Sequence, residues 1–527
     1  MEKITPIKRA LISVSDKTGL LRLARSLIEM GIQIISTGGT EKFLKDANLE
    51  VFNVSLITKF PEIMDGRVKT LHPNIHGGLL ALRHKVEHSK SMIKYDIPEI
   101  DLLIVNLYPF EKSVIKDNDY DKAIENIDVG GPAMIRAAAK NVQYLSTIVD
   151  VNDYDELLKE LIEHNGGTTL QFRKKMSQIA FSRTAEYDSI ISNWLANTWK
   201  INSPRRYTIS GKKEIDLRYG ENPHQRATLY SSSLDRCDVL SKKLIQGKEL
   251  SYNNINDLEA ASKLVNDLVE KPAAVIVKHA NPCGVAMGET CLEAYKLALN
   301  CDRTSAFGGI VAFNKVLDAK TASAVIETFT EAVIAPGVDL DAIEIFSRKK
   351  NLRLLISEKF KNDHLNEKHF KQISGGFLVQ DKDMKKITIN DLEIVSEKKP
   401  SKIELENLMF AWKIVKHTKS NAIVFAKNLA TIGIGAGQMS RFDSSRIART
   451  KAKDMSVALG YEKSVTIDSV VASDAFFPFP DGVIELINSG VSAIIQPGGS
   501  LNDQKIIDTV NKAKISMVFT GFRHFTH

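Results

Sequence analysis

The stretch Ala273-Ala274-Val275-Ile276-Val277-Lys278-His279-Ala280-Asn281-Pro282-Cys283-Gly284 decides the fold class of this chain. It begins with small and apolar residues, a run typical of a buried strand in a parallel sheet. Lys278 and His279 follow at the carboxyl end of that strand, where ligands bind in open α/β sheets. Pro282 and Gly284 are expected to stop the strand and let the backbone turn. The stretch therefore predicts an α/β fold with a ligand site at this strand end, and a solvated Lys-His pair is the alternative.

The N-terminal region alternates strands and helices. A strand over 10–14 leads to a polar turn at 15–19 and a helix over 20–30, and a second strand over 32–35 runs into 36–40. This order predicts a parallel sheet. Both turns combine hydroxyls, glycines and the start of a helix, which is how proteins hold phosphate groups. One such turn is typical of an ordinary helix cap, but two at successive strand ends predict one phosphate site.

Prolines and glycines interrupt any long helix or strand in residues 60–78. Arg67, Lys69, His72 and His76 fall within ten positions there, so we expect a functional loop. Two histidines four residues apart have the spacing of metal ligands on a helix. The proline between them is expected to prevent that helix, which disfavours a metal site.

A further buried strand is predicted over 101–110, and it delivers Asn106 and Tyr108 to its carboxyl end. A glycine pair then leads into an alanine-rich helix over 132–140, with proline at the first helical position. An arginine and Lys140 lie four positions apart and share a face of this helix. The small alanines favour a partly enclosed site, and a solvated basic stripe is the alternative.

The composition is that of a globular chain. Its 527 residues predict three or four domains, and 43% hydrophobic residues provide large cores. No apolar run approaches the roughly 18 residues of a membrane helix, and the N-terminus lacks the apolar region of a signal peptide. We therefore expect a cytoplasmic location.

Cysteine spacing and charge argue against two further classes of protein. No Cys-x-x-Cys pair occurs among Cys237, Cys283, Cys291 and Cys301, so neither a disulfide framework nor a zinc ribbon is predicted. The net charge of +7 is spread along the chain, whereas nucleic-acid binding requires a concentrated basic patch. Small anionic substrates fit the local basic clusters better.

Several long motifs occur in the order in which one enzyme family has them. They are residues 13–18, 36–40, 65–78 and 127–134 in the first half, and 217–225, 250–257, 278–282 and 305–309 in the second. These motifs resemble the bifunctional AICAR transformylase/IMP cyclohydrolase family over nearly the whole chain. The resemblance implies an N-terminal, parallel-sheet domain like methylglyoxal synthase at 1–200, the IMP cyclohydrolase. It also implies two cytidine-deaminase-like α/β subdomains without zinc, forming the AICAR transformylase, at 201–390 and 391–527.

The activity implied is the last two steps of de novo IMP synthesis. The co-substrate 10-formyltetrahydrofolate transfers its formyl group to 5-aminoimidazole-4-carboxamide ribonucleotide (AICAR), and dehydrative ring closure of formyl-AICAR (FAICAR) gives IMP. His279 suits the base that accepts the amine proton, because an imidazole ring can take up a proton at neutral pH. Lys278 supplies charge for the tetrahedral oxyanion, and Asn421 can hold the amide or formyl oxygen. The Lys-His pair converges only if the backbone turns at this point.

Ring closure is mainly an orientation task, and by resemblance Lys69, Tyr108, Asp128 and Lys140 carry it. The resemblance also implies a set of substrate-binding residues, with arginines and the two N-terminal turns holding the nucleotide phosphate. The set is Ser13, Ser15, Lys17, Ser36, Thr37, Gly38, Gly39, Thr40, Arg67, Asn106, Arg218, Tyr219, Asn254, Ser305, Phe307, Gly308, Asp339, Gln438, Asp474, Arg523 and Phe525. Val338, next to Asp339, occupies a position where the family often has an aromatic residue.

The last residues of the chain belong to the site by the same resemblance. Chain ends usually fray, so Arg523 and Phe525 have to be held by a ligand pocket or by a partner subunit. The resemblance implies a homodimer whose other partners are small nucleotide and folate substrates, with neither nucleic acid nor a membrane. It also implies a monovalent cation such as K⁺ near Thr418 and Ser420, where Ala422 replaces a serine of some relatives.

Two other functions are weighed against this one. A zinc nucleobase deaminase has a similar fold in its second half, but it needs a Pro-Cys-x-x-Cys ligand pair. Pro282 and Cys283 are followed by no second cysteine at that spacing. A basic nucleotide-binding regulator would leave two sets of reactive side chains idle. Both are therefore less favoured than the bifunctional enzyme.

Overall fold

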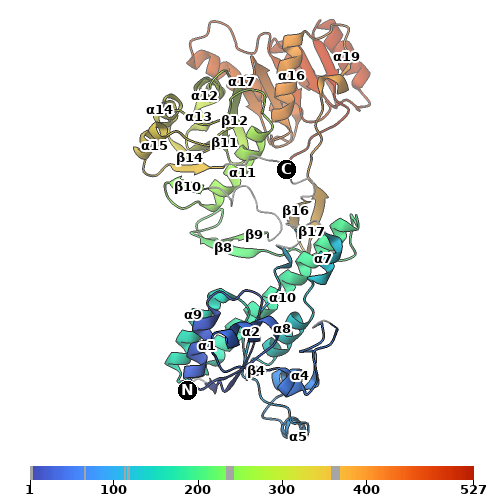
Figure 1. The fold of residues 1–527 in the computed structure, drawn as a ribbon. Helices are drawn as coiled ribbons and strands as arrows, with labels where there is room; N and C mark the ends of the chain where they lie inside the picture. Colours follow the sequence, from blue (N-terminus) through green and yellow to red (C-terminus); the bar gives the residue numbers. More distant parts are fainter. Residues whose placement is uncertain (1–3, 65–66, 112–113, 115–118, 233–242, 358–367) are drawn as a thin grey trace. The chain divides into compact units, whose positions relative to one another are not determined.

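The computed structural model describes residues 4–64, 67–111, 114, 119–232, 243–357 and 368–527. Asp65 and Gly66 of the predicted functional loop, and Cys237, lie outside the described residues. The chain divides into two compact units, the first made mainly of residues 1–212 and the second mainly of residues 213–527 (Figure 1).

The first unit contains a five-stranded sheet of order β4-β3-β2-β5-β6, in which every neighbouring pair is parallel. The strands of this sheet are β2 (Arg9–Val14), β3 (Gln33–Ser36), β4 (Phe52–Asn53), β5 (Leu102–Asn106) and β6 (Ser146–Ile148). The strands β1 (Thr5–Pro6) and β7 (Gly167–Thr168) form a separate antiparallel pair. Its helices are α1 (Leu20–Glu29), α2 (Gly38–Asp46), α3 (Ser55–Thr58), α4 (Pro73–Leu80), α5 (Val86–Lys94), α7 (Tyr120–Glu125), α8 (Gly130–Lys140), α9 (Tyr154–Glu163) and α10 (Leu170–Thr198), with a short 3-10 helix η2 (Val151–Asp153). The predicted N-terminal parallel sheet is confirmed.

Helices cover both faces of this sheet because alternate side chains of each strand point to opposite faces. Ala10 and Ile12 of β2 belong to a core cluster with residues of α1 and α9. Leu11 between them belongs to a second cluster with residues of α4 and α8. The long helix α10 contributes to both clusters, Phe172 to the first and Tyr187 to the second. The residues that follow the buried strands are thereby held by a packed core.

The second unit contains a 12-stranded mixed sheet of order β10-β15-β14-β13-β11-β12-β20-β19-β21-β22-β23-β18. Its strands are β10 (Lys243–Gln246), β11 (Ala273–Lys278), β12 (Asn281–Met287), β13 (Gly309–Phe313), β14 (Thr330–Ala335), β15 (Arg353–Ile356), β18 (Glu393–Ile394), β19 (Ile423–Lys427), β20 (Ala430–Gly435), β21 (Val470–Ser473), β22 (Ala493–Gln496) and β23 (Ser516–Phe519). Two separate hairpins are β8 (Lys212–Leu217) with β9 (Ala227–Ser231) and β16 (Lys368–Ile373) with β17 (Gly376–Asp381).

One face of the large sheet packs on α11 (Tyr252–Asn266) and α16 (Lys402–Val415), whose buried residues belong to a single core cluster. The opposite face is covered in two parts, each with its own cluster. The first part has α12 (Cys291–Leu299), α14 (Ala319–Glu327) and α15 (Leu340–Ser347), and the second has α17 (Arg441–Ala458), α18 (Pro480–Asn488) and α19 (Asp503–Lys512). Two short helices, α13 (Arg303–Ala306) and the 3-10 helix η3 (Ile389–Asp391), complete the unit.

The strand β11 is buried as the sequence predicts, but the prediction that it pairs in parallel is wrong. It pairs antiparallel with both β12 and β13. His279 and Ala280 have φ of 54° and 56°, the left-handed values required at both central residues of a tight hairpin turn. The chain re-enters the sheet at Asn281, and Pro282 and Gly284 lie within β12 beside a register shift. Proline is tolerated at such a bulge, so these residues do not end the strand pairing.

The hairpin of β19 and β20 repeats that of β11 and β12. Its turn residues Asn428 and Leu429 have φ of 51° and 55°, and its ladder has a register shift at the equivalent place. The two hairpins meet at the centre of the sheet, where the Val285 N–H donates to the Thr431 hydroxyl at 2.9 Å. Two similar α/β halves therefore share one continuous sheet.

Two helices of the first unit begin at positions that differ from the sequence-based expectation. α4 begins at Pro73, so the expectation that this proline prevents a helix is wrong. The first helical N–H groups have no intrahelical partner, and proline at the first position loses nothing. The ring of His72 caps the helix by accepting the Asn74 N–H at 3.1 Å. α8 begins at Gly130, which places Pro132 in the first turn but not at the first position.

No helix within the described ranges is long and apolar enough to cross a membrane. The described cysteines, Cys283, Cys291 and Cys301, are free and buried. Burial raises the pKa of the Cys283 thiol to about 12, which leaves it protonated and unreactive at neutral pH.

Candidate active sites

Three neighbouring strands place polar residues at one edge of the first unit's sheet. β2, β3 and β5 are adjacent and parallel, so their carboxyl ends, followed by Ser15, Thr37 and Tyr108, lie together. Asn106, the last residue of β5, accepts hydrogen bonds through Oδ1 from the N–H groups of Ser15 at 2.6 Å and Asp16 at 2.9 Å. This amide fixes the first of the two predicted phosphate turns.

Two of the predicted hydroxyl residues at this edge hold the fold together. The Ser36 hydroxyl donates to the carbonyl of Ile12 at 2.7 Å. The Thr40 hydroxyl donates to the Val14 carbonyl and accepts the Val14 N–H, both at 3.0 Å. These bonds tie β3 and α2 to β2, so both side chains position the turns.

The start of α2 has the properties of an anion site. Gly38 has φ of 53°, and a Cβ there would stand only 3.3 Å from the Lys69 ammonium. Within the described part of the chain, nothing lies within 4 Å of a Cβ built at Gly39. The backbone N–H groups of this helix start therefore stay accessible beside a cation, an arrangement that favours anions. Thr37 in the same turn donates to Glu62 at 2.8 Å.

Asp128 is the partly buried acid of this edge. Its Oδ1 accepts the Gly131 N–H at 2.8 Å, and its own N–H donates to the Tyr187 hydroxyl at 2.8 Å. Burial raises the pKa of the Asp128 carboxyl, and the Gly131 N–H, the Lys69 ammonium and the Tyr108 N–H offset only part of that rise. A carboxyl with a raised pKa is suited to accept and release protons closer to neutral pH.

Lys140 and Arg67 are also implied for this site. Lys140 is the exposed last residue of α8, whereas Asp128 precedes the first. The helix has 11 residues, and at 1.5 Å per residue its ends lie about 15 Å apart. Arg67 forms an ion pair with Glu125. The other implied residues of this edge are Ser13 in β2 and Lys17 in the turn after it.

In the second unit, the tip of the β11–β12 hairpin brings Lys278 and His279 to one place. The Lys278 ammonium donates to the Phe307 carbonyl at 2.7 Å. Asp257 on α11 accepts the N–H groups of His279 at 3.2 Å and Ala280 at 2.7 Å, which fixes the turn. The His279 residue is exposed and so accessible to a substrate. The turn on which convergence of the pair depends is therefore present.

Residues implied for the imidazole pocket surround the same tip. Phe307 is 58% exposed, and its ring centroid lies 5.2 Å from that of Phe329. Gly308 has φ of 75° and donates its N–H to the Phe329 carbonyl at 2.7 Å. Ser305 belongs to the short helix α13 before them. Asn254 is buried and lies on α11, one turn before Asp257, which holds the hairpin tip.

Arg218 and Tyr219 lie on the segment that follows β8. The Arg218 guanidinium stacks on the Tyr219 ring at 4.9 Å and donates to its hydroxyl at 3.1 Å. Two residues further on, the carbonyl of Glu221 accepts the Asn253 side-chain amide at 3.2 Å. This bond ties the segment to the start of α11, on the same helix as Asn254.

Asn421 is joined to the hairpin tip through Asn281. The Asn281 Oδ1 accepts the N–H of Lys419 at 3.0 Å, which brings the segment before β19 to the tip of the other hairpin. Asn421 donates both its backbone N–H and its side-chain amide to the Gln438 carbonyl, each at 3.0 Å. The candidate site therefore draws on both halves of the sheet.

The end of the chain docks on the same segment. The Ser420 hydroxyl accepts the Thr526 N–H at 3.2 Å and donates to Asp474, which is fully buried and also paired with Arg441. The Arg523 guanidinium lies 4.6 Å from the centre of the Phe525 ring. The tail is held as the sequence analysis requires, and within the chain itself.

Asp339 lies at the other edge of the sheet. Its N–H donates at 3.0 Å to the carbonyl of Leu317, which follows the end of β13, whereas Phe307 precedes the start of that strand. β13 has five residues, so about 16 Å of strand separates the two ends. The structure does not bring Asp339 to the hairpin tip.

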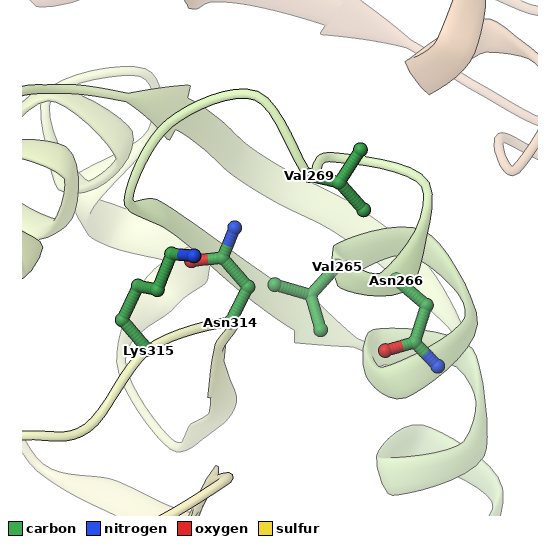
Figure 2. Close-up of a pocket in the computed structure, with 5 residues that line it drawn as sticks. All are labelled: Val265, Asn266, Val269, Asn314 and Lys315. Atoms are coloured by element: carbon green, nitrogen blue, oxygen red, sulfur yellow. The ribbon is translucent and has the colours of Figure 1, made fainter. Parts of the chain in front are cut away.

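A small cavity of about 110 Å³ also lies at that far edge (Figure 2). Its lining residues come from the end of α11 and the loop after it, and from the residues that follow β13: Val265, Asn266, Val269, Asn314 and Lys315. The cavity is therefore separate from the hairpin-tip cluster.

Comparisons with known proteins can be set beside this geometry. The family model described as AICARFT/IMPCHase bienzyme matches residues 138–451, and that of the MGS-like domain matches residues 19–133. The chain is 55% identical to the bifunctional purine biosynthesis protein PurH of Cereibacter sphaeroides, with 100% of both chains covered. The PurH proteins of Ruegeria pomeroyi and Paracoccus denitrificans are 52% and 54% identical, with 100% and 99% of each chain covered. The chain belongs to the AICARFT/IMPCHase bienzyme family.

Membership in the AICARFT/IMPCHase family confirms the predicted activity. The chain is a bifunctional enzyme of purine biosynthesis, with AICAR formyltransferase and IMP cyclohydrolase activities. Its MGS-like N-terminal domain is confirmed as well. Substrates in this family are nucleotide and folate small molecules, and formyltetrahydrofolate is the co-substrate of the formyltransferase.

Some residues that position the candidate sites are not predicted from the sequence. Asp257 and Asn281 lie inside the motifs on which the family resemblance rests, and a polar residue beside a predicted turn is a usable signal. Tyr187 and Arg441 lie within helices and reach their partners across 59 and 33 residues. No local pattern marks such long-range contacts.

Proposed function

We propose that ring closure takes place in the first unit and formyl transfer in the second, with domains at 1–200, 201–390 and 391–527. The hydrogen bond from Lys419 to Asn281 carries this proposal for the second unit. It joins the segment with Asn421 to the hairpin tip with Lys278 and His279, so one substrate can reach all three side chains. The division into units near residue 212 supports the first boundary.

In formyl transfer, the 5-amino group of AICAR attacks the formyl carbon of 10-formyltetrahydrofolate. His279 takes the proton that the amine loses. The Lys278 ammonium stabilises the negative oxygen of the tetrahedral intermediate. The intermediate then collapses, the bond from carbon to N10 of the folate breaks, and the proton from His279 goes to the departing nitrogen. Asn421 orients the carboxamide of AICAR next to the reacting amine.

The nucleotide is held by charge and by ring stacking. Arg218 and Arg523 bind the phosphate, since guanidinium groups match its oxygens in pairs. Phe307, Tyr219 and Phe525 offer exposed or partly exposed ring faces for the imidazole and the folate. Their positions around one hairpin and one docked tail support this assignment.

In ring closure, the carboxamide nitrogen of FAICAR attacks its own formyl carbon, and water leaves. Asp128 accepts the proton that the carboxamide nitrogen loses and returns it to the formyl oxygen, a task that its raised pKa supports. The nitrogen that carries the formyl carbon then loses its proton to the resulting hydroxyl, the C–O bond breaks, and water leaves as the ring C=N bond forms. Lys69 polarises the formyl oxygen, and the start of α2 holds the phosphate. Tyr108 and Lys140 stay predictions without a separate role in this scheme.

We propose that the protein is a homodimer. The β16–β17 hairpin exposes Phe377 (45%) and Leu378 (56%), and a two-stranded hairpin is marginally stable on its own. Exposed apolar patches mark interaction surfaces, and a second copy is the occupant that the family resemblance implies. In sedimentation velocity, Leu378→Lys should shift the protein toward the monomer. An unchanged dimer would place the interface elsewhere.

Two finer expectations stay predictions. A monovalent cation near Thr418 and Ser420 would have to use spare lone pairs, since these hydroxyls already donate to the Ile414 carbonyl at 2.9 Å and to Asp474. No step above depends on it. The cytoplasmic location expected from the sequence is likewise a prediction.

A paired assay tests the division of labour. The parent, His279→Ala and Asp128→Asn are each given AICAR with 10-formyltetrahydrofolate, and in a second reaction FAICAR alone. We expect His279→Ala to lose tetrahydrofolate release yet still convert FAICAR to IMP, and Asp128→Asn to do the reverse. Loss of both activities in either variant, with the fold intact by circular dichroism, would contradict two separable sites.

A further inference from the structure

The C-terminal tail is fastened by backbone hydrogen bonds along its length. Past β23, N–H groups of the tail donate to the carbonyls of Gln496, Pro497 and Asp474 at 3.0, 3.0 and 2.9 Å. The Thr526 carbonyl in turn accepts the Ser420 N–H at 2.8 Å. Chain ends normally fray, but these hydrogen bonds hold the backbone of the tail in a defined position.

His524 anchors the middle of this tail. Its side chain is only 2% exposed, and its Nδ1 is hydrogen-bonded to the carboxylate of Asp383. Its ring centroid lies 5.1 Å from the ring of Trp412 on α16. Burial, the contact with the tilted Trp412 ring and the hydrogen bond to Asp383 together hold the His524 ring in place, so it fixes the backbone on either side of it.

The residues on either side of His524 are those proposed to bind the nucleotide. Arg523 and Phe525 are both exposed, whereas His524 between them is buried. Arg523 and Phe525 lie together, 4.6 Å from guanidinium to ring centre, and Phe525 is 42% exposed. The buried imidazole and the exposed pair are alternate positions of one short segment.

Asp383 comes from a different part of the chain, two residues after the end of β17. It also accepts the Lys385 N–H at 3.2 Å. Burial alone would raise the pKa of this carboxyl, but the hydrogen bond and charge of His524, together with Lys416, lower it instead. Asp383 is therefore ionised at neutral pH and able to hold the imidazole.

We propose that Asp383 and His524 form a positioning pair for the formyltransferase site, which holds Arg523 and Phe525 in place for the nucleotide. Neither member touches the substrate. The inference rests on the proposed role of Arg523 and Phe525. It assigns a function to a partly buried His-Asp contact that the reaction itself does not use.

Variants of His524 separate this role from general packing. His524→Asn keeps an N–H donor near the position of Nδ1, whereas His524→Leu keeps bulk and removes the donor. Asp383 is 44% exposed, so water can solvate it when its partner is lost, and the fold should survive. We expect His524→Leu to raise KM for AICAR about tenfold, the effect of losing one charge-assisted hydrogen bond. His524→Asn should recover most of this loss.

Other readouts should stay constant in His524→Leu: kcat of formyl transfer, KM for 10-formyltetrahydrofolate, and conversion of FAICAR to IMP. Asp383→Ala should match His524→Leu, and the double variant should add nothing, because both remove the same bond. His417→Leu is the matched control. It breaks a similar His-Asp contact, to Asp267 at 2.8 Å, that does not involve the tail.

Arg523→Ala distinguishes the two ways of failing. An unchanged KM for AICAR in Arg523→Ala would overturn the proposed role of the tail, and the inference with it. A raised KM in Arg523→Ala but not in His524→Leu would overturn the positioning pair alone. Equal effects of His417→Leu and His524→Leu would also overturn it, since the pair would then be only structural.

Discussion

The Tyr187 hydroxyl accepts the backbone N–H of Asp128 at 2.8 Å, across 59 residues of sequence. Tyr187 lies on α10 and is 1% exposed. Burial raises the pKa of its phenol to about 12, so it stays protonated at neutral pH and can also donate. Through this hydrogen bond, α10 fixes the backbone of Asp128, the residue proposed to transfer protons in ring closure.

We expect Tyr187→Phe to weaken ring closure without affecting formyl transfer. The substitution leaves the Asp128 N–H without its partner, a loss of about 1–3 kcal/mol. The kcat/KM for FAICAR should fall about tenfold, and the first unit should unfold at lower denaturant concentration. Formyl transfer, which we propose for the second unit of the same chain, is the internal control. Equal losses in both activities would show a global effect and contradict the positioning of Asp128.

The raised pKa of Asp128 predicts opposite pH dependences for activity and stability. Since the folded carboxyl has a pKa above the ordinary 3.8, the folded state binds more protons than the unfolded state between the two values. The carboxyl therefore lowers the free energy of unfolding as pH rises through that window. The proton-accepting form grows over the same window, so the kcat of ring closure should rise with pH.

The measurement is the rate of FAICAR conversion as a function of pH, together with denaturant unfolding of the parent and Asp128→Asn. We expect an acid limb in kcat with a midpoint above 3.8. In Asp128→Asn that limb and most of the activity should be absent. A parent enzyme with no acid limb above this value would remove Asp128 from proton transfer.

Lys278 and Lys427 offer a matched pair for testing the oxyanion role. Each ends the first strand of one of the repeated hairpins, and each ammonium donates to a backbone carbonyl at 2.7 Å, that of Phe307 or of Ile467. Lys278→Met should lower the kcat of formyl transfer about 10²–10³-fold, the typical effect of removing one oxyanion donor. Lys427→Met removes the same contact away from the proposed site and should leave kcat nearly unchanged. Similar losses in both would mean that the lysines only brace the hairpins.

Strand order and strand-end motifs can be predicted from this sequence, whereas strand direction cannot, and both have physical causes. The order of elements and the motifs at strand ends predict the first sheet and the grouping of Ser15, Thr37 and Asn106, because parallel strands put their carboxyl ends at one edge. An apolar run such as 273–277 predicts a buried strand, but it does not show whether that strand pairs parallel or antiparallel with its neighbours. Its antiparallel pairing depends on the left-handed turn at His279 and on the ladder beyond it.

Contacts between distant segments are equally invisible in the sequence. Lys140 ends the helix that the Asp128 motif begins, and the length of α8 separates the two residues. Asn281 and Lys419 share no motif and are joined by a hydrogen bond. Residues that are close in the sequence are reliably close in space only within one turn or at one strand end. The candidate site of the second unit combines residues from two repeats, so its assembly cannot be predicted in this way.

The repeat itself can be tested through two glycines at equivalent positions. A Cβ at Gly284 of β12 would stand 1.9 Å from the Ala298 carbonyl oxygen, and one at Gly433 of β20 would stand 2.3 Å from that of Ala448. Each strand passes directly against the backbone of a covering helix, which cannot give way as a flexible side chain can. We expect Gly284→Ala and Gly433→Ala each to destabilise the second unit by about 3 kcal/mol or more.

Gly376→Ala is the control, because the nearest described atom to its Cβ is a side-chain carbon 4.0 Å away. Denaturant unfolding followed by the loss of formyl transfer, with ring closure as the reference, measures the effect. A loss below about 1 kcal/mol in either variant would mean that helix and strand are not packed this closely in that repeat.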